Sequence, residues 1–319
     1  MWRLVRAWRR STALLVVHGA LVAAAVFSGG GVALANHNFA DVPNSAFYHD
    51  FVDFLVQNGI TGGCGGGQYC GEDAVTRGQI AVFLKRLALV LGSCSPDMVP
   101  VGPTCIDKYE ARVWEVPPAN LALIQKIKAG TATLAELQAG ATQRGATSDD
   151  YGPGCPDTGK GCVNLYAVSI AGVTPSRFLT WFQAAVAARN AGKRLPTNAE
   201  WQAAALGTPD GAPCNTSSGA LQATGAAAGC VSGVGAFDMV GNLAEWVADW
   251  VPRSVGFCGS WGAFSDDQQC LVGAATTGAP GALIRGGNFA VGTDAGVFAV
   301  HGLNAPSSAF NGIGFRAAR

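Results

Sequence analysis

The chain has 319 residues, of which 49% are apolar and only 13% are charged, and its formal net charge is +0. This composition excludes an intrinsically disordered protein, and the length suits a leader followed by one or two folded domains. Without the four arginines of residues 1–35, 17 basic residues remain against 21 acidic ones, which makes nucleic acid an unsuitable partner.

Residues 1–35 have the features of a signal peptide. Four arginines precede an apolar run from Thr12 to Phe27, and Ala33-Leu34-Ala35 provides the small residues of a cleavage site. The run is shorter than a membrane span and is interrupted by His18. We therefore predict export, by the general or the twin-arginine route. The mature protein is expected to be secreted or held at the cell surface or cell envelope, with no membrane span.

All ten cysteines follow residue 35, and an even number of cysteines in an exported chain predicts disulfides. Their spacing favours pairs between neighbours in the sequence, each closing one loop. Zinc binding is the competing interpretation, but the chain has no CxxC pair. The expected pairs are Cys64–Cys70, Cys94–Cys105, Cys155–Cys162, Cys214–Cys230 and Cys258–Cys270.

A small helical module is expected at residues 36–92. Two helices are predicted around a Gly-rich loop, the first ended by Gly59 and the second begun by Thr76 as its N-cap. Each helix has apolar residues at helical spacing. These residues are Phe47, Phe51, Phe54 and Leu55 in the first helix and Ile80, Phe83, Leu84 and Leu87 in the second.

This module resembles a single S-layer homology repeat. The resemblance rests on Phe39-Ala40-Asp41-Val42-Pro43, on Asn58-Gly59-Ile60 and on Thr76-Arg77-Gly78-Gln79, where the family usually has Thr-Arg-Ala-Glu. It implies binding to cell-wall polysaccharide through residues 36–92. Because the family usually joins three such repeats, a helical spacer or an oligomer-forming module is the alternative interpretation.

A linker is expected at residues 93–100, followed by a second domain at residues 101–319. Alternating residues predict a strand over Thr104–Ala111, and residues Gly140–Gly161 are expected to form a surface insertion. Four helices are predicted in this domain, three of them opened by a capping box. They are Leu121–Lys128, Thr133–Ala139, the segment from Thr180 to Gly192, and the segment from Thr197 to Ala205.

The two helices within residues 180–205 have the clearest signals. Thr180 with Gln183, and Thr197 with Glu200, are spaced as capping boxes, so Glu200 is expected to be a helix cap and not a catalytic acid. The residues expected to pack inward are Phe182, Ala185 and Val186 in the first helix and Trp201 and Ala204 in the second.

The segment 285–316 near the C-terminus is rich in Gly and Asn and has no cysteine. Gly and Asn favour tight turns, while isolated Phe, Val and Ile can anchor short strands. We therefore expect a loop-rich sheet edge whose chemically mixed positions face outward.

Several motifs of residues 101–319 resemble the formylglycine-generating enzyme, or sulfatase-modifying factor, family. The resemblance implies an α+β fold of the C-type lectin-like type with little regular structure. The motifs are Ile106-Asp107-Lys108-Tyr109-Glu110, the run from Gly192 to Trp201, the run from Met239 to Trp246, and Arg285-Gly286-Gly287 with Gly314-Phe315-Arg316.

The same resemblance implies a calcium ion at the run from Met239 to Trp246. Side-chain oxygens of Asn242 and Glu245, with backbone carbonyls, are the candidate ligands. Calcium usually takes about six to eight oxygen ligands. The alternative is therefore that both side chains form hydrogen bonds that fix the loop, and no cofactor is required.

Enzymes of this family oxidise a substrate cysteine through two cysteines of their own, which follow the Arg-Gly-Gly motif and bind copper as soft thiolate ligands. Val291 and Gly296 occupy the corresponding positions here, and no cysteine occurs between Leu271 and Arg319. The histidines after residue 35 form no recognisable catalytic motif. The sequence therefore predicts no catalytic residue, with a sulfatase-modifying oxidase as the alternative.

Within this family, the segment 285–316 most closely resembles the variable region of proteins diversified by retroelements, in which adenines of Asn codons are replaced at random. The resemblance implies a non-catalytic protein that binds an unknown protein or glycan ligand at a cell or phage surface. A structural cell-envelope protein is the other alternative. The expected contact positions, each reachable from an Asn codon through its first two bases, are Ala290, Val291, Asp294, His301, Leu303, Ser308, Phe310 and Gly312.

Overall fold

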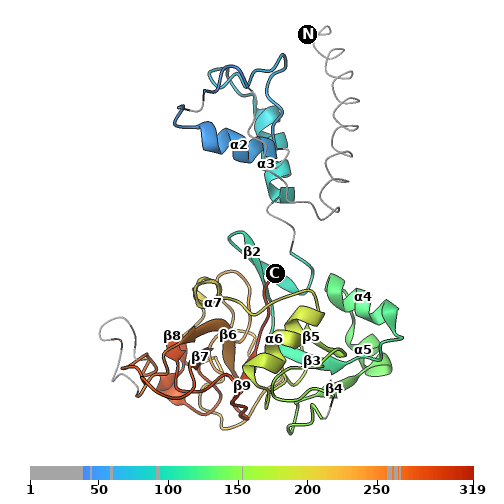
Figure 1. The fold of residues 1–319 in the computed structure, drawn as a ribbon, viewed down its shortest axis with the longest axis vertical. Coiled ribbons are helices and arrows are strands. Elements are labelled where there is room, and N and C mark those ends of the chain that lie inside the picture. Colours follow the sequence, from blue (N-terminus) through green and yellow to red (C-terminus); the bar gives the residue numbers. More distant parts are fainter. Residues whose placement is uncertain are drawn as a thin grey trace. The chain divides into compact units, whose positions relative to one another are not determined.

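The computed structural model describes residues 39–43, 45–57, 60–90, 94–152, 154–256, 261, 265 and 267–319. The expected signal peptide, residues 1–35, lies outside this description. The chain divides into two units, one ending at Ser93 and one running from Cys94 to Arg319 (Figure 1). In the described part of the chain, no helix is long and apolar enough to cross a membrane.

The first unit consists of helices α2 (His49–Gln57) and α3 (Arg77–Val90) with a Gly-rich loop between them. The loop is closed by the expected disulfide Cys64–Cys70. The Asp41 carboxylate also holds it, accepting hydrogen bonds from the backbone N–H groups of Tyr69 (2.7 Å) and Cys70 (2.6 Å). These contacts fix the loop without a large apolar core.

Helix α3 begins as expected, because Thr76 Oγ1 accepts a hydrogen bond from Gln79 N (3.2 Å) and Gln79 Oε1 accepts one from Thr76 N (2.8 Å). The predicted apolar faces are wrong in part, since Phe47 is 89% and Phe51 68% exposed. Two short helices and one loop enclose too little volume to cover these side chains. Ile80 and Leu84 are also exposed. Gly59 and the side chains of Phe54 and Leu87 lie outside the described residues.

The second unit combines short strands with four α-helices and long connecting loops. Its helices are α4 (Leu121–Ala129), α5 (Leu134–Gly140), α6 (Trp181–Asn190), α7 (Asn198–Ala205) and the 3-10 helix η1 (Gly292–Asp294). Its strands are β1 (Met98–Val101), β2 (Thr104–Asp107), β3 (Ala111–Glu115), β4 (Thr142–Arg144), β5 (Leu165–Ser169), β6 (Ala244–Val251), β7 (Gly281–Gly286), β8 (Gly296–His301) and β9 (Ile313–Phe315).

The start of this unit differs from the expectation. Strand β1 lies largely within the expected linker 93–100, because Met98–Val101 pairs with Thr104–Asp107 in an antiparallel hairpin. Cys94 is also bonded to Cys105, as predicted from their spacing. The strand expected over Thr104–Ala111 is divided, since β2 ends at Asp107 and β3 begins at Ala111.

The strands form three sheets, in the orders β1-β2, β4-β3-β5 and β8-β7-β6-β9. In the largest sheet β9 runs parallel to β6, with Glu245 opposite Gly314 and Trp246 opposite Phe315. This pairing places the last strand beside β6, and the C-terminus itself lies next to β2, as Figure 1 shows. A single apolar core joins strands of the two larger sheets to α6.

All three predicted capping boxes of the second unit are present, opening α5, α6 and α7. In α7, Trp201 and Ala204 are fully buried as expected. In α6, by contrast, the most deeply buried residues are alanines, and Phe182 and Ala185 are only partly covered. The helix packs against β5 and β6, and small side chains permit this close approach. The fully buried alanines are Ala184, Ala187 and Ala188.

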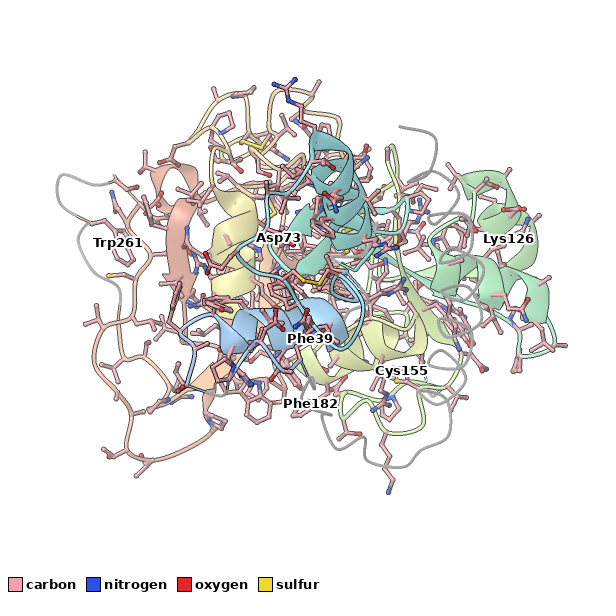
Figure 2. All side chains as sticks on the ribbon, turned by 90° about the horizontal axis from the view of Figure 1, so that it is seen from above. Phe39, Asp73, Lys126, Cys155, Phe182 and Trp261 are labelled. Atoms are coloured by element: carbon pink, nitrogen blue, oxygen red, sulfur yellow. A yellow bond between two sulfur atoms is a disulfide. The ribbon has the colours of Figure 1, made fainter. Side chains whose placement is uncertain are left out.

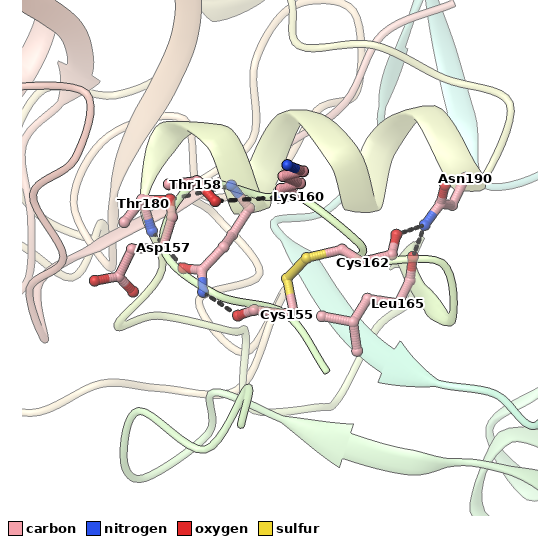
Figure 3. Close-up of a disulfide and its surroundings, with 9 residues drawn as sticks. Cys155, Asp157, Thr158, Lys160, Cys162, Leu165, Thr180 and Asn190 are labelled. Carbon is pink, nitrogen blue, oxygen red and sulfur yellow. Dashed lines mark hydrogen bonds between the residues drawn. A yellow bond between two sulfur atoms is a disulfide. The ribbon is translucent and has the colours of Figure 1, made fainter. Parts of the chain in front are cut away.

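The expected surface insertion over Gly140–Gly161 is wrong in part. Residues 142–144 form β4, and Tyr151 and Cys155 lie in the core. Figure 3 shows how the disulfide Cys155–Cys162 and its loop are attached to α6. Gln183 Nε2 donates to Cys155 O (2.8 Å), and Asn190 Nδ2 donates to Cys162 O (2.8 Å). The loop is therefore part of the folded unit.

Disulfide pairing follows the prediction wherever the structure describes both cysteines. Four of the five expected pairs are formed, including Cys214–Cys230. Cys270 is also disulfide-bonded, and its expected partner Cys258 lies outside the described residues. Disulfides of this kind are typical of proteins that fold in an oxidising compartment.

Candidate functional site

Arg285 anchors the beginning of segment 285–316 in the interior of the second unit. Its guanidinium lies over the Trp201 ring, 4.6 Å from the centroid. It donates hydrogen bonds to Asn198 Oδ1 (2.6 Å), Ala299 O (2.8 Å) and Val297 O (2.9 Å). Burial lowers the pKa of Arg285 to about 10, so the group remains charged at neutral pH. Arg285 therefore ties β7 to α7 and β8.

Arg316 anchors the other end of the segment. It is completely buried and forms an ion pair with Glu245 of β6, with Nε 2.7 Å from Oε2 and Nη2 2.7 Å from Oε1. Its remaining N–H groups donate to the carbonyls of Asp107 (3.0 Å) and Phe237 (2.8 Å). Glu245 also accepts a hydrogen bond from Trp201 Nε1 (2.6 Å). The two ends of segment 285–316 are thus linked through Trp201, which contacts Arg285 and donates to Glu245, the ion-pair partner of Arg316.

Two further buried acids lie beside this ion pair. Burial, together with the charges of Asp238 and Glu245, raises the pKa of Glu110 well above its ordinary value. Burial also raises the pKa of Asp238 to about 6, although the hydrogen bond from Gly225 N and the charge of Arg316 oppose this shift. The Glu110 carboxyl contacts Leu243 N (2.8 Å), so this cluster organises the run that precedes β6.

The expected calcium ligands do not fit an ion. Asn242 Oδ1 already accepts hydrogen bonds from Asn215 Nδ2 (3.1 Å) and Gln222 N (2.9 Å). Both oxygens of Glu245 are used by Arg316, whose positive charge would repel a cation at the same place. Within the described residues, no group of three or more His, Cys, Asp or Glu is arranged to hold a metal. The arrangement matches the alternative of hydrogen bonds that fix the loop.

The eight expected contact positions separate into two groups. Six of them are at least partly exposed, and Phe310 is the most prominent apolar one, with 48% of its surface exposed. His301, at the end of β8, and Gly312, just before β9, are buried. The six partly exposed positions are Ala290, Val291, Asp294, Leu303, Ser308 and Phe310.

His301, Phe310 and Gly312 are brought together in a hollow of about 330 Å³ over one end of the largest sheet. His301 Nδ1 lies 3.4 Å from Asn304 Nδ2, and burial lowers the pKa of His301 to about 4. The other five expected positions do not line this hollow. Its full lining is Ala244, Gln269, Ile284, Asn288, His301, Asn304, Phe310, Asn311, Gly312 and Ile313.

Sequence reasoning missed four amide residues of this lining. Asn288, Asn304 and Asn311 belong to segment 285–316, but every expected contact position was one that carries a residue other than Asn, so these three were not among them. Gln269 lies outside the segment and had no sequence signal. It reaches the hollow because its carbonyl accepts hydrogen bonds from Val300 N of β8 (3.1 Å) and from Trp261 Nε1 (3.3 Å).

Two of the expected positions have structural constraints. A Cβ atom on Gly312 would lie 2.4 Å from Asn288 Nδ2, so that amide would have to move. Val291 is the N-cap residue of η1 and is only partly exposed.

Trp261, labelled in Figure 2, contacts Phe298 of β8, with 6.0 Å between ring centroids. The surface around the hollow therefore includes side chains from outside segment 285–316.

These features define an α+β unit of short strands and long ordered loops, with a loop-built hollow at one end of its largest sheet. Residues 98–319 match the family described as sulfatase-modifying factor enzyme 1-like domain, and residues 38–81 match the S-layer homology domain. The sulfatase-modifying factor match covers more than half of the chain, so the chain belongs to the sulfatase-modifying factor enzyme 1-like family. The second unit's combination of short strands, four α-helices and long loops agrees with the α+β fold with little regular structure that was expected from the sequence.

No curated protein sequence matches the chain. Among solved structures, it is similar to the Major Tropism Determinant P3c variant, with a TM-score of 0.39 and 22% identity over 70% of this chain and 52% of that chain. CarF has a TM-score of 0.34 and 18% identity over 68% of this chain and 85% of CarF. Treponema denticola variable protein 1 has a TM-score of 0.30 and 20% identity over 45% of this chain and 70% of that chain. The chain spans about half the length of the Major Tropism Determinant variant.

Proposed function

We propose that this chain is an exported, non-catalytic protein that binds its ligand through segment 285–316, a retroelement-diversified surface on the C-type lectin-like fold. The observation that carries the proposal is the contrast between fixed and outward positions within the segment. Arg285 and Arg316 are buried and held by hydrogen bonds, whereas six of the eight expected contact positions reach solvent. Such a scaffold tolerates new side chains at most of the outward positions, whereas Val291 also packs against the apolar cluster around Cys214 and Cys230.

A non-catalytic role is supported by the residues at the positions of the family's cysteine pair. Val291 caps η1, and Gly296 begins β8. A Cβ atom on Gly296 would lie 1.5 Å from Asp267 Oδ1, so a cysteine there would displace a buried acid. No described cysteine is free to act as a thiolate. Oxygen consumption with a Cys-containing peptide in the presence of copper is the measurement that would overturn this part.

Deep sequencing of the gene and its flanking DNA in a growing population tests the diversification. We expect a neighbouring near-copy of the codons for 285–316 that differs mainly at adenines, beside a reverse transcriptase gene. Substitutions should fall on the outward positions and leave Arg285 and Arg316 unchanged. An invariant segment with no nearby template would refute diversification and leave a binder of fixed specificity or an envelope protein.

Attachment to the cell surface is the role we propose for residues 36–92. The match of residues 38–81 to the S-layer homology domain supports it. Gln79 is engaged in the capping box of α3, so binding would depend on the loop and not on an acid at this position. A pull-down of purified cell wall should retain the full chain and lose a variant lacking residues 36–92. Equal retention of both would instead favour a spacer role.

A further inference from the structure

We infer that the hollow over the end of the β8-β7-β6-β9 sheet binds one uncharged, hydroxyl-rich ring, the neutral sugar residue of a glycan. The inference rests on the proposed ligand-binding function and gives it a chemical class. It depends on three properties of the lining, namely its amide groups, its lack of ionised side chains and its apolar floor.

The polar part of the lining consists of side-chain amides. Gln269, Asn288, Asn304 and Asn311 each carry an acceptor oxygen and a donor NH2 group. Asn288 is held in place because its Oδ1 accepts a hydrogen bond from Ala290 N (3.0 Å), which leaves its NH2 group toward Gly312. A hydroxyl group both donates and accepts. Adjacent hydroxyls of a sugar therefore match adjacent amides better than a ligand that only accepts or only donates.

Among the described residues, the lining has no side chain that is ionised at neutral pH. None of the lining residues that the structure describes is Asp, Glu, Lys or Arg, and His301 is neutral because burial lowers its pKa to about 4. Arg177 touches the rim from outside, but its guanidinium already donates to Ala146 O (3.1 Å) and Asn311 O (3.2 Å). Inside the hollow, a charged ligand would lose water without meeting an ionised side chain of the described lining. The hollow therefore favours a neutral ligand.

The floor and one wall are apolar. Ala244, Ile284 and Ile313 come from three adjacent strands, and Phe310 adds an aromatic ring that is half exposed. A pyranose ring has a C–H face that packs on such a surface while its hydroxyls reach the rim. The volume of about 330 Å³ lies at the small end of ligand pockets, which span roughly 300–1,000 Å³. It suits a single ring and not a protein surface.

Part of the hollow lies outside the segment proposed to vary. Ala244, Ile284 and Gln269 precede residue 285, whereas the asparagines and Phe310 lie within it. Changes in segment 285–316 would therefore alter the asparagine rim and the aromatic wall, while Ala244, Ile284 and Gln269 stay constant. On this basis, diversification selects which sugar is bound.

The test is saturation-transfer-difference NMR with the full chain and four neutral probes, the methyl glycosides of glucose, galactose, mannose and N-acetylglucosamine. Methyl glucuronide and N-acetyl-tyrosinamide serve as charged and peptide probes. We expect transfer to at least one neutral glycoside, and affinity weaker by about tenfold or more in Phe310→Ala and in Asn304→Ala. Thr293→Ala is the matched control, since Thr293 is exposed within the segment but outside the hollow.

The inference is overturned if none of the four glycosides receives saturation, if the glucuronide or the tyrosine probe binds better, or if binding survives both hollow variants. Near-UV circular dichroism confirms that the variants are folded, and Asn304→Ala gives an independent reading if Phe310→Ala is disturbed. Failure of the proposed function has a different signature, an invariant gene segment with no template. If the gene segment is invariant but the hollow binds a neutral glycoside, the sugar-binding inference stands and the proposed diversification fails.

Discussion

Removing the buried Arg316 tests the account of how segment 285–316 is anchored. Arg316→Met deletes the charge that pairs with Glu245 and the N–H groups that satisfy the carbonyls of Asp107 and Phe237. Glu245 is 1% exposed and would retain only the hydrogen bond from Trp201. Breaking a buried ion pair in this way costs about 3–5 kcal/mol. We expect the free energy of unfolding to fall by that amount.

The chain contains a matched control at its surface. Arg194 forms a bidentate pair with Glu200, but the Arg194 side chain is 48% exposed. An exposed pair contributes about 0–1 kcal/mol, so Arg194→Met should destabilise far less than Arg316→Met. The double variant Arg316→Met with Glu245→Met should recover much of the loss, because Glu245 is then no longer left as an unpaired buried charge.

Urea unfolding followed by tryptophan fluorescence is the assay. Every tryptophan after residue 35 lies between residues 114 and 261, so the signal reports the second unit. The reasoning is refuted if Arg316→Met is no less stable than Arg194→Met. It is also refuted if the double variant is as unstable as Arg316→Met alone, since the cost would then come from lost packing and not from a stranded charge.

Three other predictions follow from local features of the same unit. The pKa of Asp238 is raised to about 6 in the folded chain. Between about pH 4 and pH 6 the folded chain therefore keeps a proton that the unfolded chain releases. The stability contributed by this group is lost as the pH rises through that window. Asp238→Asn should flatten the dependence of the urea midpoint on pH between 4 and 7, and an unchanged slope would contradict this assignment. Gly286 and Gly292 both have positive φ, so Gly292→Ala should cost about 1–2 kcal/mol of folding free energy. Gly286→Ala should destabilise the protein much more, because a Cβ atom there would also lie 2.6 Å from Met239 O. Equal thermal shifts in the two variants would count against that close contact. Thr197→Ala removes the cap of α7 and should cost about 1 kcal/mol in urea unfolding, whereas no change would mean that Glu200 holds the helix end without it.

The sequence specified features whose partners lie close together along the chain. The capping boxes at Thr133, Thr180 and Thr197 each involve residues three apart, so their chemistry is readable before any fold is known. Disulfides between neighbouring cysteines, such as Cys155–Cys162, follow the same rule. The family motifs also identified the fold, because they preserve the residues that build it.

Features that depend on burial were harder to derive. Phe47 and Phe51 have the spacing of a helix face directed inward, yet they are exposed because the described part of the small first unit encloses too little volume to cover them. In α6 the alanines, and not Phe182, form the inner face, because the distance between the helix and its strands decides which side chains fit. Periodicity alone contains no information about that distance.

The candidate site shows the same limit. Outward positions such as Ala290 and Phe310 were expected from the composition of the segment, but the hollow was not. It exists because β6, β7 and β9 bring Ala244, Ile284 and Ile313 side by side, and because Gln269 reaches its rim from a loop. The sequence by itself determined the family, the caps, the local disulfides and six of the positions in segment 285–316 that reach solvent. Tertiary structure decided which residues of that segment meet, since residues 244 and 313 become neighbours only through the parallel pairing of β6 and β9.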